Sequence, residues 1–348
     1  MASQKILGYT PIRVIVYAHI HWRSIPRVPR VILFMSERIP LPLPFGWFRM
    51  LESKELAVGE VKTVQYLGKE FVLFRTEDGE VHGVDPYCPH LGAHFGFGGV
   101  VEGNVLRCPF HHWKFDGSGQ CVDVPYAKRI PAKARVAAYP TCEANGIVFL
   151  WHHPNGDAPR WDVPEVEDWC AEGWMEPIYH TVRVRSHAQE MAENVVDSPH
   201  FHFVHGTPEI PEKTFTFDGH IMRAFQGLTF TTREGDLKGS VNIESHGGSI
   251  GITRFKGIGE TLIIVTGTPV DREYHETTMR FSFRILEEGL EATQGLAKAF
   301  IGEVTRQHAQ DVPIWENKKF HENPVLCDGD GPIHQIRKYY QQFYVETV

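Results

Sequence analysis

The sequence predicts an α+β protein in which a small all-β domain precedes a larger domain built on an antiparallel sheet. Short β-type runs separated by turns fill residues 47–152, with no helical period of useful length between them. Longer β-type runs follow in the second half of the chain, and a long helical pattern at 291–320 comes near its end. We therefore expect an N-terminal arm or linker at 1–46, the β domain at 47–152 and the larger domain at 153–348.

The composition is typical of a globular protein with two domains. The chain has 348 residues, of which 42% are hydrophobic and 22% charged. A formal net charge of -8 argues against a broad nucleic-acid-binding surface, which requires basic side chains. The six cysteines do not form the pattern of a disulfide framework, so we expect a cytoplasmic protein in a reducing compartment.

Residues 1–46 precede the first expected strand and begin with a stretch that has no acidic residue before Met35. This stretch contains Arg13, Arg23, Arg27 and Arg30. Its apolar run is too short and too polar to span a bilayer. Three hypotheses remain: a segment at a membrane surface, an arm that packs on another subunit, or a leader upstream of a start at Met35. Prolines within 39–45 predict an extended linker to the first domain.

Hairpin patterns predict the strands of the β domain. The β-type runs at 61–67 and 70–76 are followed by a turn at 77–80. The pattern continues to a last run at 146–151, and residues 153–159 are predicted to connect the two domains. No helix of useful length interrupts the series, which favours a small antiparallel β fold with functional loops at one end.

Two cysteine–histidine pairs mark two loops of this domain. Cys88 and His90 are separated by one residue, and after seventeen more residues Cys108 and His111 are separated by two. Glycines and prolines around both pairs supply tight turns that aim the four side chains at one site. Two thiolates and two imidazoles suit a [2Fe–2S] cluster with sulfur ligands on one iron and nitrogen ligands on the other. A zinc ion with the same four ligands is the alternative.

The larger domain begins with a helix-compatible run at 186–206 that breaks at Pro199. Within it His200 and His205 lie five residues apart, just after Asp197. Such a pair is by itself a weak signal for a metal, because buried histidines are common. A protein that already holds an electron-transfer cluster has a use for an iron bound by two histidines and one carboxylate, an arrangement that leaves positions open for O₂.

The missing carboxylate should come from the long helical pattern, where Asp311 is the best candidate because Pro313 and Trp315 give it a distinct setting. The competing acidic residues are Glu303, Glu316 and Glu322. Asp197 could be a ligand, or it could orient a ligand histidine. His202 is left out as a ligand because alternation along the chain points it away from its neighbours.

Two apolar runs, at 247–255 and 261–270, could line a long hydrophobic cavity, with ordinary sheet core as the alternative. The chain from His321 onward is expected to be a polar tail. Cysteines outside the two loops are expected to be buried or free thiols.

The chain resembles the Rieske non-haem iron oxygenases over about residues 40–345. The loops CPHLGAHFGFGG and CPFHHWKFDGSGQC are similar to the cluster loops of that family, and ENVVDSPHFHFVH looks like its iron motif. The resemblance implies a helix-grip catalytic domain. It implies cluster ligands Cys88, His90, Cys108 and His111, iron ligands His200, His205 and Asp311, and catalytic roles for Asn194 and Asp197.

The resemblance also implies an assembly. Such oxygenases form head-to-tail rings, commonly trimers, in which Asp197 would connect a cluster histidine to an iron histidine across a subunit boundary. Electrons would come from NAD(P)H through a reductase with flavin and an iron–sulfur cluster, and O₂ would be the cosubstrate. One departure is His112, which stands where the family usually has glycine. We expect its side chain to crowd the cluster loop or to add a titratable group near the cluster.

Finer motifs narrow the function. GGVVEGNVLRCPFH, CVDVPYAKRIP and QDVPIWENK look most like the cholesterol 7-desaturases, with the 3-ketosteroid 9α-hydroxylase oxygenase components next. This resemblance implies desaturation of a sterol at C7–C8, or hydroxylation of a steroid. The alternatives are a Rieske oxygenase for another apolar or aromatic substrate and a pure electron carrier. The second alternative is disfavoured because nearly 200 residues follow the β domain.

Overall fold

The computed structural model describes residues 38–232 and 235–345. The expectations for residues 1–37 lie outside this part of the chain. Its first region is all-β apart from the single-turn helix η1 (Ser53–Glu55). The strands of this region are β1 (Gly46–Glu52), β2 (Val61–Tyr66), β3 (Lys69–Arg75), β4 (Val81–Val84), β5 (Val100–Glu102), β6 (Val105–Arg107), β7 (Lys114–Phe115), β8 (Cys121–Asp123), β9 (Ala138–Tyr139), β10 (Thr141–Ala144) and β11 (Ile147–His152).

These strands form three antiparallel sheets, with strand orders β1-β11-β10, β2-β3-β4-β9 and β5-β6-β7-β8. Strand β3 shows how the sequence builds two hydrophobic cores from one run. Side chains alternate along a strand, so Phe71 and Leu73 join one core while Val72 and Phe74 join another. The continuous apolar run of β3 is therefore explained by burial on both faces, and the second of these cores also contains Cys88 and Cys108.

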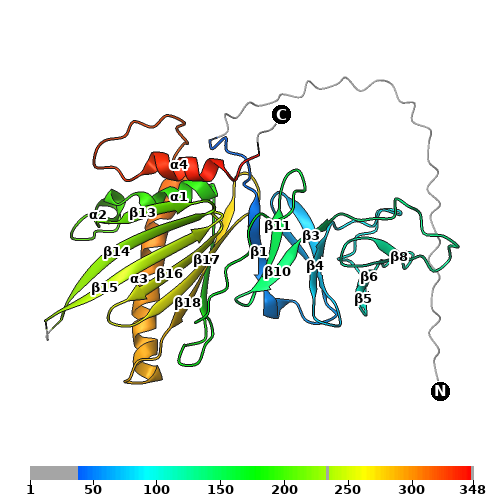
Figure 1. The fold of residues 1–348 in the computed structure, drawn as a ribbon, viewed down its shortest axis with the longest axis horizontal. Coiled ribbons are helices and arrows are strands. Elements are labelled where there is room, and N and C mark those ends of the chain that lie inside the picture. Colours follow the sequence, from blue (N-terminus) through cyan, green and yellow to red (C-terminus); the bar gives the residue numbers. More distant parts are fainter. Residues whose placement is uncertain (1–37, 233–234, 346–348) are drawn as a thin grey trace, which may run out of the picture. The chain divides into compact units, whose positions relative to one another are not determined.

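The second region is built on one seven-stranded antiparallel sheet of order β12-β18-β17-β16-β15-β14-β13 (Figure 1). Its strands are β12 (Ile178–Val184), β13 (Thr214–Asp218), β14 (Ile221–Thr232), β15 (Gly235–His246), β16 (Ile250–Lys256), β17 (Thr261–Pro269) and β18 (His275–Phe283). The α+β prediction, with an all-β part followed by a larger antiparallel-sheet domain, is confirmed.

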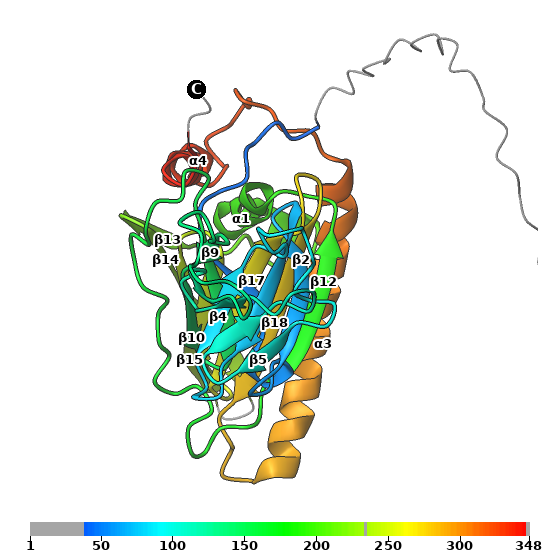
Figure 2. The same ribbon diagram turned by 90° about the vertical axis from the view of Figure 1, so that its right-hand side faces the viewer.

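Helices cover one face of this sheet. They are α1 (Ala188–Val196), α2 (Pro199–Phe203), α3 (Leu290–Asn317) and α4 (Ile333–Gln341). The long helix α3 runs beside β12 and β18 (Figure 2), close to the predicted range 291–320. The opposite face of the sheet, with Leu262 and Ile264, shares a core with Trp47 of β1 and Trp151 of β11.

The expected polar tail after His321 is wrong, because this segment contains α4. Ile336, Tyr339 and Tyr340 of α4 are buried, and Phe343 follows them with no exposed surface. These positions recur every three to four residues, which places them on one face of the helix. That face packs in a core with Val196 of α1. The charged residues between them hid this face in the sequence.

Residues 40–45, for which an extended linker was predicted, belong to no helix or strand, and the segment from Arg38 does more than lead into the β domain. The guanidinium of Arg38 donates to the carbonyl oxygens of Trp315 and Lys318 at 2.8 and 2.6 Å. It also donates to the carbonyl oxygen of Arg185 at 2.5 Å. The segment therefore packs on the second region, and Arg38 binds the C-terminal end of α3. No helix in the described ranges is long and apolar enough to cross a membrane.

A buried ion pair joins β1 to β18. The guanidinium of Arg280, with no exposed surface, donates to both carboxylate oxygens of Glu52 at 2.5 and 3.1 Å. Such a bidentate pair fixes the relative orientation of the two side chains as well as the distance between them. It therefore ties the first region to the seven-stranded sheet of the second.

Candidate metal centres

The two cysteine–histidine loops each fold back onto their own cysteine. The amide of Cys88 donates to Ala93, and the carbonyl oxygen of Cys88 accepts from Gly92 at 3.0 Å. In the same way the amide of Cys108 donates to Trp113, and its carbonyl oxygen accepts from His112 at 3.2 Å. The sequence supplies these tight turns through glycine and proline, as predicted.

The four candidate ligands lie together as a thiol pair and an imidazole pair. Cys88 and Cys108 are buried side by side, and burial together with the Cys108 thiol raises the pKa of Cys88 to about 12. The rings of His90 and His111 have centroids 4.6 Å apart, and Trp113 stacks on His90. The Nδ1 atom of His111 is buried and has no hydrogen-bond partner within residues 38–232 and 235–345. Paired thiols and an unpartnered ring nitrogen fit the ligands of an iron–sulfur cluster.

The same arrangement disfavours the zinc alternative. Within the described ranges, the one group of three or more metal-ligating side chains whose ligand atoms lie within 4.8 Å of one another is found elsewhere, at His200, His205 and Asp311. The loop residues instead form a thiol pair and an imidazole pair. Two pairs, one of sulfur and one of nitrogen, favour two irons.

His112 does not crowd the loop, which was the first of the two effects expected of it. Its backbone has φ +58°, a left-handed conformation that glycine adopts without strain. Its side chain is exposed to solvent instead of packing against the candidate ligands. The backbone turn therefore explains why glycine suits this position.

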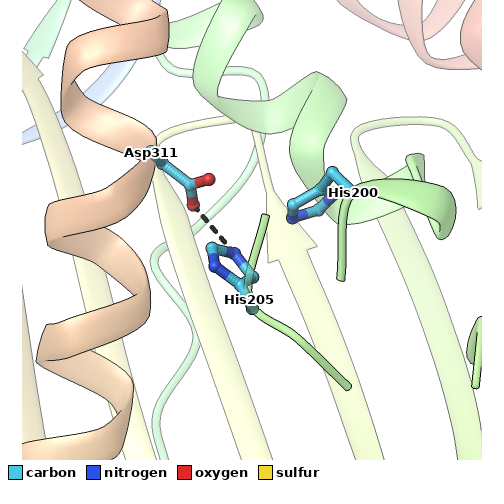
Figure 3. A group of neighbouring side chains, drawn as sticks. All are labelled: His200, His205 and Asp311. Atoms are coloured by element: carbon cyan, nitrogen blue, oxygen red, sulfur yellow. Dashed lines mark ion pairs between the residues drawn. The ribbon is translucent and has the colours of Figure 1, made fainter. Parts of the chain in front are cut away.

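The second candidate centre brings together side chains that are far apart in the sequence. His200 lies in α2, His205 follows this helix, and Asp311 projects from α3 (Figure 3). The Nε2 atom of His205 is 3.4 Å from Oδ2 of Asp311, and the two imidazole rings have centroids 5.0 Å apart. The structure thus places the three predicted iron ligands around one point.

Both imidazole rings are held by hydrogen bonds to residues other than the three candidate ligands. Nδ1 of His200 donates to the carbonyl oxygen of Asp197 at 2.5 Å, and Nδ1 of His205 donates to Oε1 of Gln310 at 3.1 Å. Arg306 donates to the same oxygen of Gln310 at 2.9 Å. With Nδ1 engaged in each ring, Nε2 keeps the lone pair that a metal needs. Gln310 and Arg306 were not singled out in the sequence, because only the packing of α3 brings them to His205.

The electrostatics of Asp311 also fit a cation. Burial raises the pKa of this carboxyl to about 6, although His205 and the side chain of Asn194 favour the charged form. Asn194 is itself fixed, since its Oδ1 accepts from Nε1 of Trp315 at 3.1 Å. Burial lowers the pKa of His200, which keeps this imidazole neutral. A neutral imidazole beside a carboxylate that lacks solvent is a good environment for a divalent metal.

His200, His205 and Asp311 are called the triad below. Asp197 lies next to the triad but is not part of it. One carboxylate oxygen accepts from the amide of His200 at 3.4 Å, and the other is 3.7 Å from Nδ1 of the same ring. The side chain is 39% exposed, so it reaches the surface while touching His200. His202 is directed away, with Nδ1 bonded to the carbonyl oxygen of Thr207. Glu303, a competitor for the third ligand position, pairs with Arg306.

A cavity of about 350 Å³ opens beside the triad, between α1, α3 and the sheet. Both apolar runs predicted to line a cavity contribute to it. Residues 248–251 and Thr253 line it at and just before the start of β16, and Val265 and Gly267 line it from β17. Leu262 and Ile264 belong to the core on the opposite face, so the runs serve both as cavity wall and as sheet core.

Family models match almost all of the described chain. A model of the Rieske [2Fe-2S] domain matches residues 46–140. A model of the 3-ketosteroid 9alpha-hydroxylase C-terminal domain matches residues 150–344, which is more than half of the chain. The chain belongs to the Rieske non-haem iron oxygenases. As a member of this family the chain carries a Rieske [2Fe–2S] domain and the domain that holds the non-haem iron.

The relatives with similar sequences include enzymes with two different activities in their names. A probable 3-ketosteroid-9-alpha-monooxygenase oxygenase component of Rhodococcus rhodochrous is 33% identical, with 87% of this chain and 80% of the relative aligned. The cholesterol 7-desaturase of Caenorhabditis elegans is also 33% identical, with 89% of this chain and 78% of the relative aligned.

Solved structures share the fold at lower identity. NdmA of Pseudomonas putida CBB5 with caffeine has a TM-score of 0.67 and 20% identity, over 85% of this chain and 89% of that one. Dicamba monooxygenase bound to dicamba has a TM-score of 0.63 and 17% identity, over 86% and 96%. The fold of the oxygenase is therefore shared with enzymes whose bound molecules differ widely.

Proposed function

We propose that this Rieske oxygenase oxidises a sterol or steroid. The first candidate reaction is desaturation of a cholesterol-like substrate at C7–C8, and the second is 9α-hydroxylation of a 3-ketosteroid. The observation that carries the proposal is the largely apolar cavity that ends at His200, His205 and Asp311. The names of the relatives, which include both activities, support it.

In this proposal Cys88, His90, Cys108 and His111 hold the cluster. His200, His205 and Asp311 hold the iron. When bound, the two groups supply single electrons and the activation of O₂. The contribution of the chain is to orient the ligands and to keep the reacting carbon in a dry site.

The residues around the triad perform distinct tasks in that site. Asn194, held by Trp315, fixes the carboxylate of Asp311, and Gln310 fixes the ring of His205. Apolar side chains place a hydrocarbon substrate beside the open side of the triad and exclude water. They are Met191, Met222, Ile250, Val265, Met279 and Val304.

The proposal extends to a head-to-tail homotrimer. The sheet β5–β8, which bears the cluster loops, lies on the opposite side of β1–β11 from α1 and α2 (Figure 1). Apolar side chains at the tips of these loops are exposed: Leu91 at 65%, Phe97 at 77% and Phe110 at 60%. We propose that they contact a neighbouring subunit and that Asp197 of that neighbour accepts a hydrogen bond from a cluster histidine. Cytoplasmic localisation, with any membrane contact restricted to residues 1–46, belongs to the same proposal.

Product analysis tests the substrate assignment. The purified oxygenase, supplied with a flavin and iron–sulfur reductase and NADH, is given cholesterol, androst-4-ene-3,17-dione and a set of aromatic methyl ethers. We expect oxidation of at least one steroid, with an alkene from cholesterol or an alcohol from the ketosteroid. Conversion of an aromatic substrate without conversion of any steroid would contradict the proposal.

A further inference from the structure

A buried histidine lines the cavity, and one of its two ring nitrogens has no hydrogen-bond partner among the described residues. His275 is the first residue of β18, and its side chain lines the cavity. The residue is only 4% exposed, and its Nδ1 atom has no partner in the part of the chain that the structure describes. None of the roles assigned above uses this side chain.

The fold places His275 at the other end of the cavity from the candidate iron. It lies close to His187, the residue that caps the start of α1. Helix α1 then covers the cavity from Ala188 to Asn194, and Asn194 contacts Asp311. Six residues of helix span about 9 Å, which is comparable to the length of a fused ring system.

A glycine of the neighbouring strand, Gly267 opposite Thr277, makes room for the ring of His275. A Cβ atom at Gly267 would lie 2.4 Å from Nε2 of His275, so any side chain at 267 would displace the imidazole. Thr277 and Met279 follow His275 on the same face of β18 and also line the cavity. The glycine thus keeps one polar ring at the end of a wall that is otherwise mostly apolar.

The imidazole is neutral, because burial lowers the pKa of His275 to about 3. A neutral imidazole has one nitrogen that donates and one that accepts. It can therefore accept from a hydroxyl group, or donate to a carbonyl oxygen by adopting the other tautomer. A single polar group of this kind in an apolar cavity usually fixes the orientation of the ligand.

We propose that His275 hydrogen-bonds the oxygen at C3 of the steroid and so determines which carbon lies beside the iron. This inference rests on the proposed function, whose two candidate substrates carry a hydroxyl group or a carbonyl group at that carbon. His275 is in this view a specificity-determining residue.

Other polar side chains of the cavity are placed less well for this role. Nζ of Lys213 lies over the ring of Phe201 at 3.8 Å and donates to the carbonyl oxygen of Val195. His308 is on α3 one turn before Asp311, near Trp315, so it belongs to the triad end. His275 is the group that combines burial, a missing partner and a position remote from the triad.

The test compares cholesterol with cholest-5-ene, which lacks only the C3 hydroxyl group. For the wild-type enzyme we expect kcat/KM to be about 100-fold higher with cholesterol, because a site built for a hydroxyl group discriminates against its absence. The variant His275→Leu should lose this preference through a higher KM for cholesterol, with little change for cholest-5-ene. The variant His275→Gln, whose amide can donate and accept, should restore most of the preference.

Thr277→Val is the matched control, since it removes a hydroxyl group from the same face of the same strand. It should keep the preference of the wild-type enzyme, and circular dichroism with thermal denaturation verifies folding of each variant. Equal turnover of both sterols by the wild-type enzyme, or an unchanged preference in His275→Leu, would overturn the role of His275 and leave the proposed function intact. The wild-type comparison needs no variant, so it decides even if His275→Leu does not fold. Failure to oxidise any steroid would overturn both proposals.

Discussion

The carboxylate of Asp311 is a point where protons and iron compete. Its pKa of about 6, raised by burial, means that the protonated form dominates below that pH in the metal-free protein. A proton must leave before the metal binds, so iron affinity should fall as pH drops through 6. We expect binding at pH 5 to be at least about tenfold weaker than at pH 7, measured by titration of the iron-depleted protein with Fe(II) under anaerobic conditions. Asp311→Asn should bind weakly at both pH values, and a pH-independent affinity in the wild-type protein would refute this account.

Removal of one triad histidine should separate the two metal centres. In His200→Ala the cluster loops are untouched, so the visible spectrum of the cluster should persist while oxygenation is lost. Iron should fall from about three atoms per chain to about two, measured by elemental analysis. His202→Ala is the control, because its ring is bonded to Thr207 outside the triad. Loss of the cluster spectrum in His200→Ala would show that the iron site is misplaced.

The left-handed residue in the second cluster loop provides a third test. His112→Gly removes the strain of a side chain at φ +58° but makes the unfolded chain more flexible, and these effects partly cancel. We expect a gain in stability of at most about 1 kcal/mol, measured by thermal loss of the cluster absorbance. Because the ring is exposed, the pH dependence of the cluster reduction potential should not change. A changed pH dependence would restore the original expectation that His112 influences the cluster.

At the scale of elements, the Glu52–Arg280 pair should couple β1 to β18. Glu52→Leu leaves the guanidinium of Arg280 buried without its carboxylate, which should cost about 3–5 kcal/mol. The double variant Glu52→Leu/Arg280→Met removes both charges and should recover part of that loss, because Arg49, which also pairs with Glu52, keeps only Glu276. Chemical denaturation monitored by tryptophan fluorescence measures the free energy of unfolding of the single and the double variant. Equal losses in the single and double variants would show that the pair does not act as a unit.

Some elements could be predicted from local patterns, and others depend on packing. The alternation in β16 and β17 and the helical run of α3 are properties of their own residues, and both were visible in the sequence. The apolar face of α4 consists of Ile336, Tyr339 and Tyr340 among charged neighbours, and only its contact with α1 explains it. The position of residues 38–45 likewise depends on Arg38 finding the carbonyl oxygens at the end of α3.

The residues of the candidate sites likewise divide into those that local sequence patterns predict and those that depend on packing. The cluster residues are close in sequence and lie in turns of recognisable composition, so their spacing was informative. Asp311 had to be chosen among several acidic residues, because the approach of α3 to α2 is a tertiary feature. His275 could not be found at all, since what distinguishes it is a missing partner inside a cavity.

At the scale of the whole molecule, the proposed trimer predicts complementation between chains. If the cluster of one subunit serves the iron of the next, a Cys108→Ser chain and a His200→Ala chain are each inactive alone. Trimers reassembled from a mixture of both should regain part of the wild-type activity, because some interfaces pair an intact cluster with an intact iron site. The measurement is product formation after mixing and reassembly. Activity that stays at zero would favour electron transfer within one chain.

Arg38 has a consequence for how the enzyme is made. The first described residue of the chain binds the end of α3, the helix that carries Asp311 and is synthesised more than 250 residues later. Domains fold during synthesis from the N-terminus onward. The strands around the cluster loops are complete by His152, so this part can fold on the ribosome while the partner of Arg38 does not yet exist. We therefore expect sequential biogenesis, in which the electron-transfer module matures first and the oxygen-reacting site is finished only after translation has almost ended.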